Sequence, residues 1–235
     1  MPSVIKADYQ LGGEYTPAAG VNVVVRDSTG QPAPGLFNIC YINGFQSQPE
    51  SDWPKVLLLL DAKGKPIADE NWPDEYLLDI STGAKREAIL GRLVPVIAAC
   101  AAKGFKAVEF DNLDSYTRSR GRLTLADAVA FAKMLVVATK SAGMAAGQKN
   151  AADLSQRGRS EIGFTFAVSE ECHRWDECRA YTAVYGSQII NIEYSDDLRG
   201  TFEKVCADAE TPKSTILRDR MLVPKGGAGY VYRRC

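Results

Sequence analysis

The segment from residue 104 to residue 116 constrains the fold of this 235-residue chain more than any other. Apolar Val108 and Phe110 alternate there with Glu109 and Asp111, and amide, hydroxyl and further carboxylate side chains follow at once. Because successive side chains of a strand point to opposite faces, the two carboxylates share one face and the two apolar residues share the other. The pattern predicts a strand with an apolar outer face and an acidic inner face.

Carboxylates on the inner face of a strand need partners, because the transfer of an unpaired ionised group out of water costs several kcal/mol of free energy. They either pair with a cation or line a cleft. The sequence Asp-Asn-Leu-Asp at 111–114, directly after the strand, favours a cleft with a function. An ordinary turn rich in Asp and Asn is the structural alternative.

Composition limits the classes of function. The chain is 46% hydrophobic, which is enough for a large core, and it needs neither a metal nor an oligomer in order to fold. Its formal net charge is -1 and it has no block of lysine and arginine, so we predict no nucleic-acid partner and no anionic membrane surface. No apolar run reaches transmembrane length. The oligomeric state stays open.

The cysteines and the histidine restrict the chemistry further. Six cysteines suit three disulfides, although buried free thiols would give the same even count. Cys172 and Cys178 flank a short predicted loop and are the best candidate pair. His173 is the only histidine, which excludes Ser-His-Asp and Cys-His hydrolase sites. Without a Cys-x-x-Cys motif, a zinc site is also disfavoured.

Strand and helix patterns alternate along most of the chain. Helices are predicted around 89–100 with a kink at Pro95, from a capping box at Thr124 and Asp127 to Ser141, over 175–185 and over 202–209. Eight strands are predicted, which end near Asp27, Asn43, Asp79, Asp111, Lys149, Glu170, Glu193 and Asp219. Such alternation implies parallel strands joined by right-handed crossovers, and eight units predict an α/β fold of the (β/α)8 TIM-barrel type.

In this prediction residues 1–235 form a single barrel domain. Residues 1–20 form an N-terminal extension that packs on the barrel and adds at most one short strand near residues 9–12. A doubly wound open sheet is the alternative fold, but no Gly-x-Gly-x-x-Gly follows the first predicted strand.

Polar side chains follow nearly every predicted strand, and the carboxyl ends of barrel strands meet at the rim where active sites are built. The candidate substrate-binding residues are Tyr41, Asn43, Asp79, Asn112, Asp114, Tyr116, Lys149, Asn150, Glu193 and Tyr194. The rim aromatics, with Trp72 and Trp175, have the shape to stack on sugar rings, although aromatics more often serve packing.

A rim of carboxylates without a histidine or a phosphate loop favours acid-base hydrolysis of glycosidic bonds. A divalent-metal site made from the same carboxylates is the competing chemistry, and it would make activity sensitive to a chelator. We predict no cofactor and no bound metal.

Four segments carry a resemblance to a known family, namely residues 107–116, 148–150, 167–178 and 192–194. They resemble the motifs of glycoside hydrolase family 114, the endo-α-1,4-polygalactosaminidases, and the Glu-x-Cys-x5-Cys element from Glu170 to Cys178 is the most specific of them. The resemblance implies a secreted barrel enzyme, its leader peptide already removed, that cleaves α-1,4-linked galactosamine polymers internally with retention of configuration.

The resemblance also implies a catalytic pair, with Asp111 as the nucleophile and Glu170 as the acid/base. Swapped roles remain an alternative, and Glu171 replaces Glu170 if the strand ends one residue later. A barrel that binds glycan without cutting it and a hydrolase of other α-galactosides are the other two hypotheses.

Galactosamine without its acetyl group is cationic, so the charge of the rim bears on the substrate. We expect a local negative field, few bases opposing it, and hence a preference for free-amine chains and weaker binding at high salt. The acids expected to produce this field are Asp114, Glu171, Glu193, Asp196 and Asp197.

Overall fold

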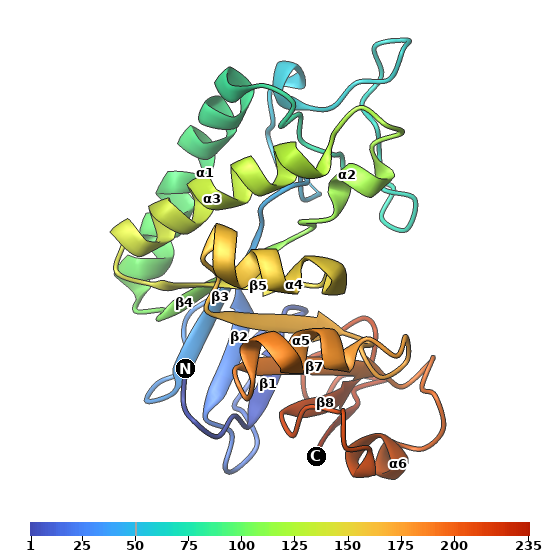
Figure 1. Ribbon diagram of the computed structural model, residues 1–235. Coiled ribbons are helices and arrows are strands. Elements are labelled where there is room, and N and C mark those ends of the chain that lie inside the picture. Colours follow the sequence, from blue (N-terminus) through green and yellow to red (C-terminus); the bar gives the residue numbers. More distant parts are fainter. Residues whose placement is uncertain (50) are drawn as a thin grey trace.

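The computed structural model describes residues 1–49 and 51–235, and it contains a nine-stranded sheet whose strands follow one another in sequence order (Figure 1). The first eight strands are parallel and curve into a nearly closed barrel, and β9 runs antiparallel to β8. The strands are β1 (Ala7–Gln10), β2 (Val23–Asp27), β3 (Phe37–Asn43), β4 (Ala107–Asp111), β5 (Ala145–Lys149), β6 (Phe166–Glu170), β7 (Ile189–Tyr194), β8 (Thr215–Arg218) and β9 (Tyr232–Arg234). The predicted parallel α/β barrel is therefore confirmed.

The helices cover the barrel unevenly. Two long helices, α1 and α3, lie beside β3, β4 and β5, whereas α5 lies against β6 and β7 (Figure 1). The helices are α1 (Gly83–Lys103), α2 (Ser115–Arg118), α3 (Leu125–Ser141), α4 (Ser155–Arg157), α5 (Cys178–Tyr185) and α6 (Phe202–Ala207), with short turns η1 (Lys55–Leu57), η2 (Ala152–Leu154) and η3 (Gly158–Ile162).

Local sequence signals account for the two long helices. The side chains of α1 that are buried are those at the predicted spacing, Ile89, Leu93, Ile97 and Cys100. The capping box at the start of α3 is formed, with the Thr124 hydroxyl accepting from the backbone of Asp127 and the Asp127 carboxylate accepting in return. The helix predicted from residue 175 begins three residues later, at Cys178.

One predicted strand is wrong, and a different segment takes its place. Residues 76–80 make only isolated bridges with neighbouring loops and do not join the barrel sheet. The first barrel strand is instead β1, which lies within residues 1–20 and pairs with β2. The apolar residues of the misread segment are buried for another reason, because Leu77, Leu78 and Ile80 fill the core outside the barrel.

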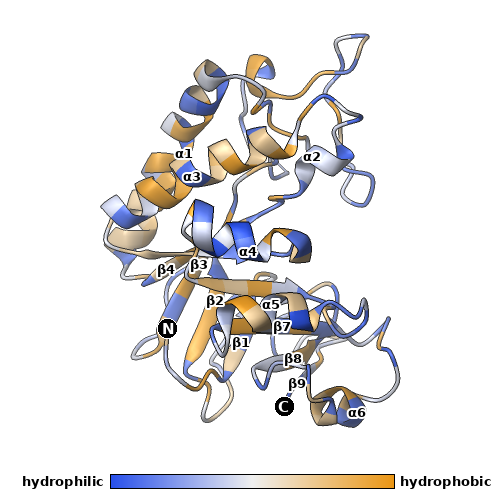
Figure 2. Cartoon of the chain, in the orientation of Figure 1, coloured by the Kyte–Doolittle hydropathy of each residue, from blue (hydrophilic) through white to orange (hydrophobic). Residues whose placement is uncertain are grey.

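Alternate strand residues face two different cores, as period-two geometry requires. Val25, Ile39 and Val168 point into the barrel, whereas Val108 and Phe110 point outward against the helices. The apolar colouring of the strands in Figure 2 reflects burial on both faces.

The seam between β1 and β8 is closed by side chains, since the described residues form no backbone ladder there. Arg218 is fully buried at this seam, and its guanidinium donates to the carbonyl oxygens of Tyr9, Val223 and Val231. The Tyr232 hydroxyl of β9 donates to the carbonyl of Ala7 at 2.8 Å. These hydrogen bonds connect β1 to β8 and β9 in place of strand pairing, and so they close the barrel at the seam.

Three disulfides join all six cysteines. The predicted pair, Cys172 with Cys178, is formed in the loop after β6. The other two tie Cys40 of β3 to Cys100 of α1, and Cys206 of α6 to Cys235. Among the described residues, no helix combines the length and the apolar character needed to cross a membrane.

Candidate active site

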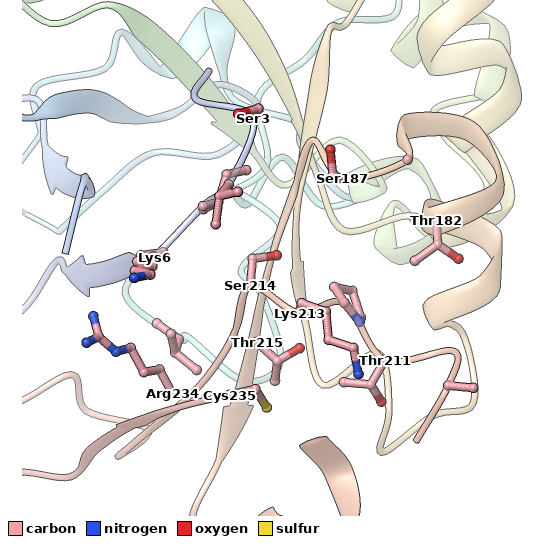
Figure 3. Close-up of a pocket in the computed structure, with 17 residues that line it drawn as sticks. Ser3, Lys6, Thr182, Ser187, Thr211, Lys213, Ser214, Thr215, Arg234 and Cys235 are labelled. Carbon is pink, nitrogen blue, oxygen red and sulfur yellow. The ribbon is translucent and has the colours of Figure 1, made fainter. Parts of the chain in front are cut away.

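A pocket of about 480 Å³ opens at the carboxyl ends of the strands, the end predicted to carry the site. It is lined by the ends of β2 to β7 and by loops from both halves of the chain. A second pocket, of about 450 Å³, lies at the opposite end of the barrel and is lined by hydroxyls, lysines and an arginine (Figure 3). No Asp or Glu occurs among the described residues that line this second pocket, whereas the first is lined by several of them.

The backbone turns sharply where β4, β5 and β6 end. The next residues, Asn112, Asn150 and Glu171, have φ of 63°, 50° and 60°, in the left-handed region that few residues other than glycine adopt. Asn tolerates this region better than most, which explains its occurrence after two of the three strands. Such backbone strain is typical of functional sites. Here it changes the direction of the chain directly after each strand, next to the strand-end side chains that line the pocket.

Asp111 and Glu170 lie close together in this pocket and share one lysine. The Lys149 Nζ is 3.3 Å from the Asp111 Oδ2 and 3.1 Å from the Glu170 Oε2. These two oxygens are therefore at most 6.4 Å apart, the sum of 3.3 and 3.1 Å. Lys149 is only 2% exposed and rises from the floor of the site on β5, between the strands that carry the carboxylates.

Each carboxylate of the pair has further hydrogen-bond donors. The Tyr41 hydroxyl donates to Asp111 Oδ2 at 2.8 Å, and the backbone N–H of Asn112 donates to Oδ1 at 2.8 Å. The Asn150 Nδ2 donates to Glu170 Oε2 at 2.9 Å, and the Tyr194 hydroxyl donates to Oε1. Charge-assisted bonds of this kind hold both side chains in fixed orientations.

These contacts set the protonation of the site. Burial works to raise the pKa of Glu170, but the Lys149 ammonium and the bonds from Tyr194 and Asn150 outweigh it, so that pKa is lowered. Burial likewise works to lower the pKa of Lys149, but the carboxylates of Asp111, Glu170 and Glu109 outweigh it and raise that pKa. Lys149 is therefore a permanent cation between two anions.

Glu109 lies deeper in the barrel, as the strand pattern predicted. It is fully buried, and its Oε1 accepts from the Tyr9 hydroxyl at 2.6 Å, whereas Oε2 has no partner in the described part of the chain. Burial raises the pKa of Glu109 to about 8, so this carboxyl is mostly protonated at neutral pH. Lys149 forms its ion pairs with the two rim carboxylates and not with Glu109.

Most of the predicted site residues meet in the pocket. Its lining includes Tyr41, Asp111, Asn112, Asp114, Lys149, Asn150, Glu170 and Tyr194. Asn43 lies behind this lining, where its amide donates to Glu75 and its carbonyl oxygen accepts from Asn112. Tyr116 lies on α2 and packs against the outer core instead of lining the pocket.

Two predicted site residues are placed elsewhere. Asp79 accepts from Lys85 and from the Ser81 hydroxyl near the start of α1, outside the barrel sheet. Glu193 is fully buried and accepts from the backbone N–H of His173 at 2.9 Å. The reason is register, because Tyr194 faces into the barrel and Glu193, one residue earlier, must face out.

The expectation of unopposed acids at the rim is also wrong for four of the five residues named, all except Glu193. Arg220 pairs with Glu171 at 2.9 Å and with Asp196 at 2.8 Å, while Arg174 pairs with Asp197 and Arg118 with Asp114. Arg118 is only four residues from Asp114, but Arg174 and Arg220 are distant in sequence from the acids they pair with, so counting acids along one segment could not reveal those pairs.

Sequence reasoning missed five charged residues that line the pocket, namely Asp27, Asp69, Glu75, Arg118 and Arg220. Asp27 ends a predicted strand, which is a signal of the kind used for the other residues. Glu75 and Arg220 lie in loops without a motif, and no sequence signal marks them. The described residues contain no group of three or more His, Cys, Asp or Glu arranged to hold a metal ion.

Comparison with known proteins decides the family. The model of glycoside-hydrolase family GH114 matches residues 2–235. The chain belongs to glycoside hydrolase family 114. It is therefore a glycoside hydrolase, as the resemblance of its motifs predicted. None of the curated proteins compared matches it in sequence.

Two solved structures share the fold of this family 114 chain. Ega3 of Aspergillus fumigatus, in complex with galactosamine, is 23% identical with a TM-score of 0.77, and the match covers 100% of this chain and 96% of that one. The glycoside hydrolase domain of PelA from Pseudomonas aeruginosa is 15% identical with a TM-score of 0.61, and the match covers 94% and 96% of the two chains. These similarities support the barrel fold over the whole chain.

Proposed function

We propose that this enzyme cleaves α-1,4-linked galactosamine-containing polysaccharide internally, with retention of configuration, and that Asp111 and Glu170 are its catalytic pair. The observation that carries the proposal is the placement of both carboxylates on one lysine, with facing oxygens at most 6.4 Å apart. Retaining glycosidases keep their carboxyl groups about 5 to 5.5 Å apart, whereas inverting ones need about 6.5 to 9.5 Å to admit a water molecule. The separation supports retention.

The substrate class rests on the family and on the similarity to Ega3, whose structure is a complex with galactosamine. Tyrosine rings and amide groups around the pair provide the stacking and hydrogen bonding that sugars need. The alternative of a divalent metal between the carboxylates is disfavoured, because the ammonium of Lys149 occupies the position that such an ion would take.

In the proposed mechanism Asp111 attacks the anomeric carbon while Glu170 gives its proton to the departing glycosidic oxygen. The Tyr41 hydroxyl, the Asn112 backbone N–H and Lys149 hold the Asp111 carboxyl in a fixed orientation. Formation of the glycosyl ester removes the negative charge of Asp111, which lowers the pKa of Glu170. Glu170 then acts as the base that activates water in the second step.

The lowered pKa of Glu170 also bears on the assignment of roles. A nucleophile must be ionised, so this shift favours the swapped arrangement, in which Glu170 attacks and Asp111 is the acid/base. Azide distinguishes the two, because it replaces a missing nucleophile from the opposite face. With the proposed roles, Asp111→Ala and azide give a glycosyl azide of inverted configuration, and Glu170→Ala and azide give one of retained configuration.

The decisive experiment compares wild type, Asp111→Asn and Glu170→Gln on α-1,4-linked galactosamine polymer, with reducing ends and product size as the readout. We expect oligomers from the wild type with retained configuration by NMR, and activity at least about 1000-fold lower in each variant. Glu87→Gln on the exposed face of α1 is the matched control and should keep full activity. A folded wild type that releases no oligomers would refute the proposal.

We also propose an extracytoplasmic location. Three disulfides that use every cysteine are typical of proteins from oxidising compartments and rare in cytosolic ones. Cell fractionation checks this, and a fully reduced cytosolic protein with normal activity would contradict it.

A further inference from the structure

A hairpin in the β3–α1 connection forms one wall of the catalytic pocket. Ile67 and Leu77 are paired at its base, and the backbone N–H of Asp69 donates to the carbonyl of Glu75 at 2.9 Å. At the tip, the Asp69 Oδ1 accepts from the backbone N–H of Asn71 at 2.9 Å and of Trp72 at 3.3 Å. The connection, cyan in Figure 1, lies beside α2.

The hairpin is anchored to the barrel through the other oxygen of Asp69. Its Oδ2 accepts from the Gln46 side chain at 2.9 Å and pairs with Arg118 of α2 at 2.9 Å. The hairpin is therefore a positioned part of the site, because its turn is bonded internally and its acidic anchor is buried at 4% exposure.

Trp72 lines the pocket from this hairpin and is 52% exposed. The Trp72 indole is therefore a half-exposed apolar ring in a polar pocket, and no aromatic ring or cation of the described structure stacks on it. The apolar C–H face of a hexose can stack on such a ring, as it does on aromatic side chains in sugar-binding sites.

Glu75 lines the same pocket three residues after the indole. Its Oε2 accepts from the Asn43 amide at 3.0 Å, and it has no ion pair with a described residue. The neighbouring acids differ, because Asp69 and Asp114 share Arg118. Burial and the nearby Asp111 raise the pKa of Glu75 to about 7, as expected for a carboxyl that lacks a cation.

The opposite wall of the pocket contains a cation of its own. Arg220 lines it, neutralises Glu171 and Asp196, and covers the ring of Tyr194 at 4.5 Å. Carboxylates without a partner cation among the described residues therefore face an entering cationic group at Glu75 and at Asp27, whose donors Thr29 and Gln48 are neutral. On the opposite wall, Arg220 already offsets part of the negative charge.

We propose that the hairpin of residues 67–77 is a binding subsite for a sugar that carries a free ammonium group, with Trp72 stacked on the ring and Glu75 paired with the ammonium. The inference rests on the proposed function and specifies how the chain would recognise its substrate. Because neither side chain belongs to the catalytic pair, the subsite acts on binding and not on the chemical step.

The test compares Glu75→Gln and Trp72→Ala with wild type on two polymers of the same length, one fully de-N-acetylated and one fully N-acetylated. We expect Glu75→Gln to raise KM about tenfold on the free-amine polymer at about pH 8, above the Glu75 pKa of about 7, with kcat within about twofold, because a charged acceptor becomes neutral. KM on the acetylated polymer should not change. Trp72→Ala should raise KM on both polymers, because stacking does not depend on the amine.

Glu70→Gln is the matched control, since Glu70 is an exposed carboxylate on the same hairpin and does not line the pocket. An equal KM for wild type and Glu75→Gln on the free-amine polymer would overturn the inference. An equal loss on both polymers would overturn it too, since it would mean that Glu75 only supports the fold of the hairpin.

A binding measurement separates this inference from the proposed function. Titration calorimetry of a galactosamine oligomer into wild type and Glu75→Gln does not require cleavage. Binding that Glu75→Gln weakens about tenfold supports the subsite even if the wild type cuts no polymer. Cleavage by the wild type together with equal binding by both proteins would leave the proposed function standing and refute the subsite.

Discussion

Replacement of Lys149 by methionine tests the electrostatic core of the site. The Lys149 ammonium is 2% exposed and lies 3.3 Å from Asp111 and 3.1 Å from Glu170. Methionine keeps most of the side-chain volume and removes the charge, so two partly buried carboxylates would face each other without a cation.

The size of the effect follows from these distances. At about 3.2 Å and an effective dielectric constant of about 20, each ion pair contributes about 5 kcal/mol of attraction, most of which offsets the desolvation of the charges. Removal of one partner from a buried pair costs about 3 to 5 kcal/mol. We expect a loss of about 4 kcal/mol in the free energy of unfolding at neutral pH, and a melting temperature lower by about 10 °C.

The sign of the pH dependence can be worked out from Glu170, whose pKa is lowered in the folded protein mainly by Lys149 acting against burial. A carboxylate of this kind contributes stability above its unfolded pKa, and this stability is lost as the pH falls through the folded pKa. Without Lys149, burial raises the folded pKa of Glu170 above the unfolded one. The penalty in the variant should therefore be large at neutral pH and shrink towards about pH 4, where the carboxylates protonate in both states.

Urea unfolding of wild type and Lys149→Met at several pH values measures this directly. Lys106→Met is the control, because Lys106 is an exposed lysine just before β4 and its replacement should change stability by less than about 0.5 kcal/mol. A loss below about 1 kcal/mol at neutral pH, or a loss that stays constant down to about pH 4, would refute the reasoning.

Three further predictions follow from the contacts. Tyr194→Phe removes a donor to Glu170, so we expect the pKa of Glu170 to rise and kcat to fall about 10- to 100-fold, and an unchanged pH–rate profile would contradict this. In urea, Glu75→Gln should have the same free energy of unfolding as wild type below about pH 4.5, and one about 1 to 2 kcal/mol higher at pH 8. The reason is that the pKa of Glu75 is raised in the folded protein, so the stability that this carboxyl contributes is lost as the pH rises to about 7. Equal stability of the two proteins at pH 8 would count against this prediction. Removal of Cys40–Cys100, which spans 60 residues, should cost about 4 kcal/mol against about 2 for Cys172–Cys178, which spans 6, and the reverse order in urea would show that loop entropy does not dominate.

The sequence by itself determined the class of fold and pointed to the two carboxylates that we propose as the catalytic pair. Period-two alternation identified β4, and the abrupt change from apolar to polar residues placed Asp111 and Glu170 at strand ends. The capping box at Thr124 located the start of α3. These features depend on neighbours a few positions apart, and so a local pattern is enough to reveal them.

Tertiary structure decided the rest. Residues 77–80 are as apolar as a strand, yet only the packing of the outer core shows that they fill space beside the barrel, while the short β1 enters it through its pairing with β2. Lys149 meets two carboxylates from neighbouring strands, and Arg220 neutralises acids on two other loops. Charge in a site is a sum over groups that are close in space and distant in sequence, so only the fold shows which acids stay free of a cation.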